Sequence, residues 1–237
     1  MSQFLGNMTT PNFLFDVARG LFEGASPVNI FGFNRDVGID YETVWNDGGN
    51  YTYPSSAVAM TVTTSSASDY GKTVLIQGLD ASYDPISEIV TLAAVGAVTT
   101  GLFLRVNTVV ILDGENIGNI TVANSAVTHG YIEALTGIMQ ACNYSVARNH
   151  SLYIFRIDAN SATANPNKFL TIRNVTCNSE GRKLRVAEAT FSTSQVSYDR
   201  QVPFKLEEKT DFQFEAKSSS GTNEIAIFVE AVLVKTP

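Results

Sequence analysis

Two histidines, His129 and His150, are the side chains best suited to act as a base near neutral pH. A hydrolase needs such a base beside a nucleophile, yet no Gly-x-Ser-x-Gly elbow accompanies either residue. Their spacing also differs from the HExxH pattern of a zinc enzyme, and no phosphate-binding glycine loop or dinucleotide fingerprint is present. We interpret both histidines as structural or solvated turn residues, and we expect no catalytic residue, no cofactor and no enzymatic activity.

Acidic side chains form two groups that could ligate a hard cation such as Ca²⁺, which prefers oxygen ligands. Asp80, Asp84 and Glu88 flank one turn, and residues 113–116, Asp-Gly-Glu-Asn, form a second acidic loop. Neither group matches the spacing of a calcium-binding loop, and short acidic side chains in turns commonly cap nearby backbone amides. We favour the capping role and predict no metal site.

Flat aromatic side chains surround the loop NDGGNYTYP, and such faces can stack on sugar rings. Trp45, Tyr51 and Tyr53 are therefore candidates for contact with a glycan or with another subunit. Amphipathic aromatics also fill the ends of β-sandwiches and the seams between subunits. The sequence favours this second interpretation.

The N-terminal region carries a candidate docking segment. Residues 11–24 place apolar side chains at helical spacing, and residues 26–34 add further aromatics beside Pro27. The candidate docking residues are Phe13, Leu14, Val17, Leu21, Ile30, Phe31 and Phe33. A short amphipathic arm cannot bury its apolar face alone, so we expect it to pack either on its own sandwich or on a neighbouring subunit.

Composition limits the kinds of partner. The chain has 237 residues, a formal net charge of −7 and a charged fraction of only 16%. Gripping nucleic acid needs a basic face, so we expect no nucleic-acid partner. The N-terminus lacks the pattern of a secretory signal, and no apolar run is long enough for an ordinary membrane span, so we expect a protein made in the cytoplasm without a membrane partner.

Short β-prone runs separated by Gly, Asp and Ser turns follow one another from residue 36 to the C-terminus. The clearest pair lies at 73–92, where two apolar runs flank a polar turn. This rhythm predicts an all-β protein, a jelly-roll-like or Ig-like β-sandwich with a short N-terminal helical arm. We divide it into an arm at 1–35 and two lobes at 36–137 and 138–237. The alternative is one larger sandwich in which early strands pair with residues 224–234.

Six segments together resemble a family of virion structural proteins encoded by tailed bacteriophages, especially marine phages and cyanophages. They are IFGFNRDV at 30–37, VWNDGGNYTYP at 44–54, VLIQGLDASYDPISEIVTL at 74–92, FLRVNTVVIL at 103–112, GNITV at 118–122 and EIAIFVEAVLVK at 224–235. The chain departs from the family at AAVGAVTTGL, residues 93–102, and at VARNHS, residues 146–151. Both departures lie in expected turns, so they concern loops rather than the fold.

The resemblance implies a non-enzymatic capsid or tail component located in the virion. The expected role is that of a capsid decoration or knob protein, which docks on the capsid surface as part of a homo-oligomer. Its partners would be the major capsid protein or other virion proteins. The alternative is a host-recognition module of a tail or head fibre, which would bind glycans through Trp45, Tyr51 and Tyr53.

Overall fold

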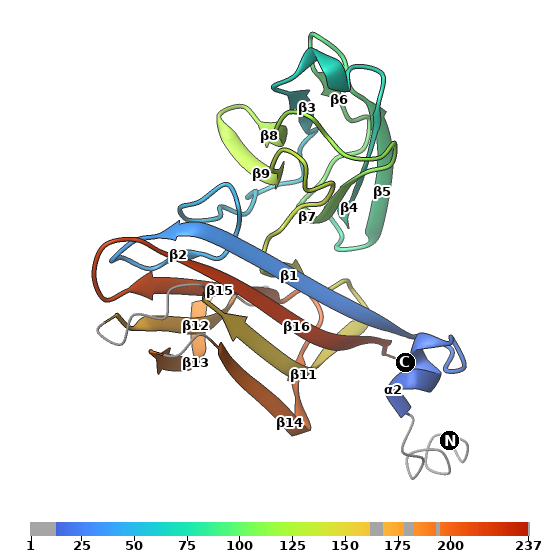
Figure 1. Cartoon of the computed structure of the whole chain (residues 1–237). Helices are drawn as coiled ribbons and strands as arrows, with labels where there is room; N and C mark the ends of the chain where they lie inside the picture. The colour runs from blue at the N-terminus through green and yellow to red at the C-terminus, as the bar shows by residue number, and fades with distance from the viewer. Residues whose placement is uncertain (1–12, 162–167, 178–182, 193–194, 237) are drawn as a thin grey trace.

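The computed structural model describes residues 13–161, 168–177, 183–192 and 195–236 (Figure 1). Within these ranges the chain is almost entirely antiparallel β-structure, arranged in four sheets. One short α-helix, α2 (Phe13–Ala18), precedes the strands, and a single 3-10 turn covers Ala67–Asp69. The all-β prediction is confirmed, while the jelly-roll-like or Ig-like topology stays a prediction.

Two of the sheets form what we call the large lobe. The outer sheet has the strand order β1 (Ala25–Val37), β16 (Asn223–Lys235), β11 (His150–Asn160) and β14 (Gln195–Leu206). The second sheet has the order β10 (Asn143–Ser145), β15 (Asp211–Ser218), β12 (Leu170–Cys177) and β13 (Lys183–Phe191), and β2 (Glu42–Thr43) pairs with β15. A shared apolar core, with Ile154 and Ile227 from one sheet and Phe212 from the other, lies between them.

The other two sheets form the small lobe, drawn above the large lobe in Figure 1. One has the order β6 (Ala97–Val98), β3 (Thr61–Thr64), β8 (Ile120–Asn124) and β9 (Val127–Ile132). The other has the order β5 (Pro85–Thr91), β4 (Thr73–Leu79) and β7 (Arg105–Ile111). They enclose a separate core that includes Met60, Ile76 and Val122.

The hairpin expected at residues 73–92 is present as β4 and β5. Val74 pairs with Val90 and Leu79 with Pro85, and the turn between the strands places Tyr83 at a positive φ of 64°. Gly78 permits the close approach of β7, because a Cβ there would lie 1.9 Å from the carbonyl oxygen of Arg105. This part of the sequence therefore specified both its strands and their pairing.

The N-terminal arm is shorter than the sequence suggested. Residues 25–35, expected in the arm, belong to β1, which pairs with β16 from Ala25 opposite Val234 to Val37 opposite Asn223. Pro27 is tolerated because β1 is an edge strand. Gly32 marks a close contact rather than a break, since a Cβ there would lie 2.4 Å from the Cβ of Cys142. This pairing is the one foreseen in the single-sandwich alternative.

Strand β16 turns one face to the large-lobe core and the other to solvent. Ile225, Ile227 and Val229 point into the large-lobe core, whereas Phe228, between Ile227 and Val229, and Glu230, after Val229, are exposed. This alternation is the period of a strand buried on one face. The outer sheet consequently presents a second, partly apolar face away from the core. None of the helices in the described part of the chain is long and apolar enough to cross a membrane.

Candidate docking surface and lobe junction

Helix α2 lies at the ends of β1 and β16 (Figure 1). Val17 is 1% exposed, and Phe13 stacks on Phe22 with ring centroids 5.2 Å apart. The remaining apolar side chains of this segment face solvent, with Leu14 47%, Phe15 62% and Leu21 59% exposed. The helix therefore packs on its own lobe through one side and leaves a second apolar side uncovered.

The solvent face of the outer sheet carries further apolar side chains, separated from α2 by the polar pair Asn29 and Glu230. Phe31 and Phe228 lie opposite each other on β1 and β16, with ring centroids 4.4 Å apart. Phe33, two residues further along β1, lies under the guanidinium of Arg35 at 5.6 Å. Beside α2 is a groove of about 380 Å³, lined by Phe13, Tyr153, Phe155, Gln201, Pro203, Val232 and Val234.

We call the exposed side of α2 with Leu21 just after it, this groove and the pair Phe31–Phe228 the α2 surface. It contains Phe13, Leu14, Leu21 and Phe31 from the predicted docking set, and Phe33 lies next to it. Val17 lies on the buried side of α2 and is not exposed to a partner. Ile30 is only 6% exposed and belongs to the large-lobe core, so its assignment as a docking residue is wrong. The reason is that β1 is a strand, whose neighbouring side chains point to opposite faces.

Charges beside the α2 surface are paired with one another. Arg156 lies 2.8 Å from Asp158 and 3.4 Å from Asp199. These ion pairs are partly exposed and contribute little stability individually. An apolar centre with a polar, charge-balanced rim is the usual anatomy of a protein–protein interface.

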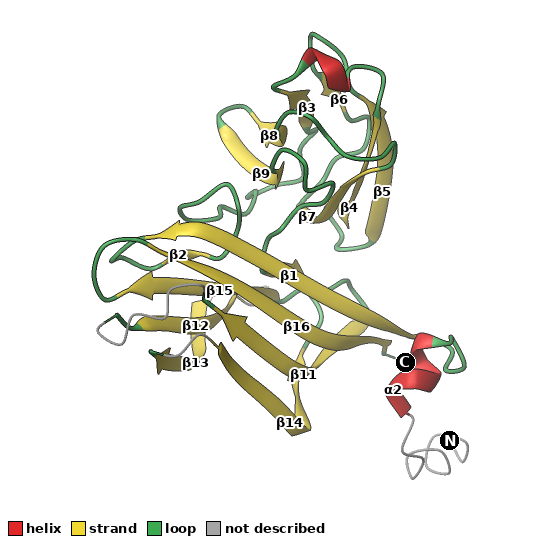
Figure 2. Ribbon diagram, in the orientation of Figure 1, coloured by secondary structure: helices red, strands yellow, loops and turns green. Residues whose placement is uncertain are grey.

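The predicted aromatic loop lies at the junction of the two lobes, where loops connect the sheets (Figure 2). Trp45 and Tyr51 are 3% and 6% exposed, and their rings meet edge to face at 5.1 Å. Tyr53 meets Tyr51 in the same way at 4.9 Å. Each polar tip is satisfied: the Trp45 indole donates to the carbonyl of Gly48, and the Tyr51 hydroxyl donates to that of His129.

These contacts leave the faces of Trp45 and Tyr51 covered by the protein itself. Buried aromatic rings cannot stack on a sugar, so the hypothesis of a glycan site at this loop loses the two side chains on which it mainly rested. The alternative, in which the aromatics fill a seam, agrees with their position. The seam lies between two lobes of one chain.

A buried ion pair crosses this junction. Arg105 of β7 donates from Nε and Nη2 to the two carboxylate oxygens of Asp211 on β15, at 2.7 and 2.8 Å. The Ser145 hydroxyl also donates to Asp211, at 2.6 Å, and the guanidinium lies 5.0 Å from the ring centre of Tyr53. Burial lowers the pKa of Arg105, but the Asp211 carboxylate prevails and raises it. The Arg105–Asp211 pair therefore joins the two lobes through a bidentate, charge-assisted contact.

The histidines make backbone contacts. His129 lies in β9 rather than in a turn, is 3% exposed, and places Nδ1 3.0 Å from the carbonyl oxygen of Thr52. Burial lowers the pKa of His129 and nearby Arg105 lowers it further, whereas the contact with Thr52 raises it. His150 is the first residue of β11, with Nδ1 2.8 Å from the carbonyl oxygen of Arg148. The turn prediction for His129 is therefore wrong, because the residue belongs to a buried strand.

Asp80, Glu88 and Asp113 cap backbone amides, whereas Asp84 pairs with the guanidinium of Arg148. Asp80 accepts from the amides of Ser82 and Asp84 at 2.8 and 3.0 Å. Glu88 accepts from the amide of Gly101 at 2.8 Å, and Asp113 accepts from the amide of Thr73. Within the described residues, no group of three or more His, Cys, Asp or Glu side chains is placed to hold a metal ion.

Sequence reasoning missed the pair Arg105–Asp211, whose partners lie 106 positions apart. One signal was available: Arg105 interrupts the apolar run FLRVNTVVIL, and a charge in a buried strand requires a partner. Nothing in the sequence names that partner.

No family model matches the chain, and no curated protein matches it. Among solved structures, it is similar to the structure of infectious bursal disease virus, Gx strain, with 12% identity over 89% of this chain and 71% of that chain and a TM-score of 0.27. It is also similar to the crystal structure of the VP2 subviral particle of infectious bursal disease virus, with 9% identity, coverages of 95% and 82%, and a TM-score of 0.23. Similarity at this level is weak and carries no inference about function.

Proposed function

We propose that this chain is a non-enzymatic structural protein of a phage virion. In this role it docks on the capsid surface as a decoration or knob protein and acts as part of an oligomer. Its partners are the major capsid protein or other virion proteins. The resemblance of six segments to phage virion proteins supports the class, and the α2 surface supports docking as the mode of action.

The observation that carries the proposal is the exposure of apolar side chains on α2 and just after it. Leu14, Phe15 and Leu21 are each about half exposed or more, and Phe228 on the adjoining sheet is 46% exposed. Contiguous apolar patches of this kind commonly mark interaction sites, because only a partner removes them from water. When an oligomer of the chain binds a symmetric capsid through several identical contacts, its overall affinity exceeds that of each single contact.

The test uses purified particles from a phage that lacks this protein. The full chain should bind these particles with a saturable stoichiometry that matches the particle symmetry, as measured by co-sedimentation and by electron microscopy. The combined variant Leu14→Ser, Phe15→Ser and Leu21→Ser should weaken binding at least about tenfold, because burying each large apolar side chain is worth roughly 1.5–3 kcal/mol.

A matched control exists at a distance from α2. Ile39, Val95 and Val98 are 63%, 94% and 60% exposed, so their combined replacement by Ser removes comparable apolar area elsewhere. The proposal requires this control to bind as the unmodified chain does. Equal binding by the α2 variant, or equal loss in both variants, would contradict docking through the α2 surface.

A further inference from the structure

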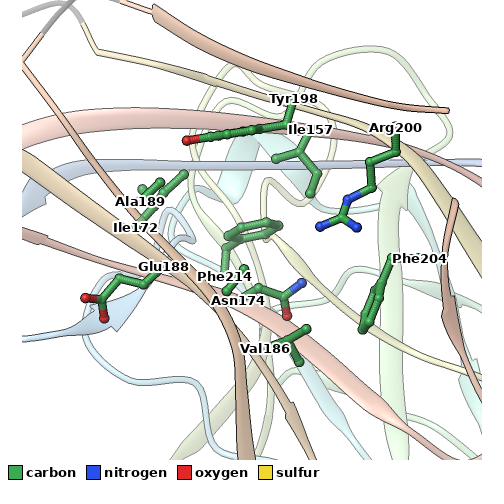
Figure 3. A pocket seen from close by; sticks show the side chains of 11 residues that line it. Ile157, Ile172, Asn174, Val186, Glu188, Ala189, Tyr198, Arg200, Phe204 and Phe214 are labelled. Atoms are coloured by element: carbon green, nitrogen blue, oxygen red, sulfur yellow. The ribbon is translucent and has the colours of Figure 1, made fainter. Parts of the chain in front are cut away.

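Apolar features also lie outside the α2 surface and the lobe junction. One is a cavity of about 130 Å³ in the large lobe, between β13 and β14, with Arg200 and Glu188 among the side chains that line it (Figure 3). Another is the solvent face of the sheet β5–β4–β7 in the small lobe. A cavity of this size accommodates about one ring-sized group, whereas the sheet face offers an extended contact.

An apolar row crosses this sheet on its solvent face. Ile89 of β5 pairs with Leu75 of β4, which pairs with Val110 of β7. Val110 in turn pairs with Ile138, in the segment that follows β9. Paired residues of antiparallel strands point to the same face of a sheet, and the neighbours of Leu75 along β4 are fully buried. The row therefore faces solvent, with Ile89 58% and Ile138 43% exposed.

Uncharged polar side chains flank the apolar row on both sides. Gln77 pairs with Ser87 and Thr108 on one side, and Thr73 pairs with Thr91 on the other. No side chain in these three rows, which we call the β4 face, is ionisable. An antiparallel sheet with one solvated face normally turns apolar residues inward and polar residues outward. A contiguous apolar row on the outer side consequently indicates a contact surface.

Charged side chains lie beyond both ends of the β4 face. At one end, the carboxylate of Asp113 accepts from the amide and the hydroxyl of Thr73. At the other end, Asp84 of the β4–β5 turn lies 2.8 Å from Arg148. A centre without charge and a charged rim are the usual arrangement of a protein–protein interface.

The size of the β4 face suits a weak contact. At ~3.3 Å per residue along a strand and ~4.8 Å between strands, the three rows cover on the order of 400 Å². Stable interfaces bury roughly 800 Å² of each partner, and smaller ones belong to weak or transient complexes. Two molecules free in solution would therefore associate through this face only at high concentration.

A second copy of the chain is the partner that this face fits. The chain has a formal net charge of −7, so two copies repel each other wherever their acidic surfaces meet. Two β4 faces can approach without bringing charged groups together. A charged partner surface would lose its hydration there and find no counter-charge. Identical faces are also self-complementary about a two-fold axis, the commonest symmetry of soluble oligomers.

We propose that two copies of this chain pack on each other through their β4 faces, apolar row against apolar row, about a two-fold axis. The inference rests on the proposed function for its setting, because copies docked on a capsid are held at high local concentration, where a weak contact suffices. The α2 surface belongs to the large lobe and the β4 face to the small lobe (Figure 1). Docking through α2 therefore leaves the β4 face open to a neighbouring copy.

The test is sedimentation equilibrium of the full chain, without particles, from ~1 μM to ~1 mM protein. The expected result is a monomer–dimer equilibrium with a Kd of ~1 mM or below. Added salt should strengthen the dimer, because it screens the repulsion between two chains of net charge −7. A chain that stays monomeric at the highest concentration, or an association that weakens as salt is added, would overturn the proposal.

A charge placed in the apolar row should break the dimer. Ile89→Asp should raise the Kd at least about tenfold, because the two-fold contact would then bury two unpaired carboxylates. Thr63→Asp is the matched control, since Thr63 is exposed on β3, in the other sheet of the same lobe, and the change adds the same charge. The Kd of the control should stay within about twofold of that of the unmodified chain. An unchanged Kd for Ile89→Asp, or an equal rise in both variants, would contradict the proposal.

Two further variants complete the test. Ile138→Asp, at the other end of the row, should raise the Kd in the same way and decides the matter if Ile89→Asp does not fold. The combined variant Leu14→Ser, Phe15→Ser and Leu21→Ser should dimerise as the unmodified chain does, because α2 belongs to the other lobe. Loss of its dimerisation would overturn the proposal. The experiment contains no particles, so a failure of docking through α2 would leave its result unchanged.

Discussion

The lobe junction and the α2 surface are both rich in aromatic side chains, yet they differ in what those side chains carry. At the junction, Trp45 and Tyr51 have polar tips that hydrogen bond to backbone carbonyls, and both are buried. At the α2 surface, Phe15 and Phe228 have no polar atom and remain exposed. A buried Trp or Tyr can hydrogen bond through its polar atom and so stabilise the folded chain. An exposed Phe is removed from water only when a partner binds over it.

The two regions also differ in their charges. Arg105 and Asp211 at the junction are buried and bonded through two contacts, so each depends on the other. The ion pairs that Arg156 makes beside the α2 surface are partly exposed, so each contributes little stability. Substitutions at the junction should therefore act on stability, and substitutions at the α2 surface should act on binding.

The largest effect is expected for Asp211→Asn. This change leaves the Arg105 charge buried without its counter-ion, which should destabilise the chain by ~3–5 kcal/mol. Urea unfolding followed by fluorescence is the suitable measurement, because the chain's only tryptophan, Trp45, lies at the junction. Asp84→Asn is the control: its pair with Arg148 has side chains 42% and 44% exposed, and its loss should cost at most ~1 kcal/mol. Equal costs for the two variants would remove the distinction between the regions.

A smaller effect is expected for Tyr51→Phe. The substitution keeps the ring packed against Trp45 but removes the hydroxyl that donates to the His129 carbonyl, 2.9 Å away. The buried carbonyl loses its donor, which should cost about 1 kcal/mol. Phe15→Leu, a comparable apolar change at the α2 surface, should leave the urea midpoint unchanged. A Tyr51→Phe variant as stable as the unmodified chain would show that the ring alone holds the junction.

Acid should weaken the junction through His129, by a smaller amount. The folded-state pKa of His129 is lowered by burial, so the unfolded chain binds the proton more readily. The resulting destabilisation is absent above the pKa of His in the unfolded chain, near ~6.5. The free energy of unfolding falls as the pH drops below that value toward the pKa of His129 in the folded chain. Unfolding curves at pH 7.5 and 5.5 should show the loss, and His129→Gln should reduce it. An identical pH dependence in the variant would exclude His129 as its source.

The smallest effect on stability is expected at the α2 surface. Leu14→Ser, Phe15→Ser and Leu21→Ser each replace an exposed side chain, and such changes usually alter stability by no more than ~0.5 kcal/mol. Urea unfolding of the three single variants checks this expectation. A loss comparable with that of Asp211→Asn would mean that the helix is part of the core rather than a docking element.

The sequence predicts those features that depend on neighbouring residues. Alternation of apolar residues located the strands, and the polar turn between residues 79 and 85 identified the β4–β5 hairpin. The capping acids followed from turn chemistry, since Asp80 bonds to amides within four residues of itself.

Features that depend on distant residues were not predictable in the same way. The sequence places residues 25–35 in the arm, where Ile30, Phe31 and Phe33 lie beside Pro27, because the partner strand β16 lies at the other end of the chain and leaves no local signal. The hydroxyls of Tyr51 and Tyr53 donate to carbonyls of β9 and β15, contacts that no local pattern encodes. Periodicity identifies a strand's two faces, but only its partners decide which face stays exposed.

Amide hydrogen exchange of the full chain, free and bound to particles that lack the protein, tests the central distinction most directly. The distinction predicts slower exchange on binding in α2 and in the adjoining strands β1 and β16, with no change at residues 43–53 of the junction. Protection at the junction without protection at α2 would contradict it, because the buried aromatics would then be the binding element.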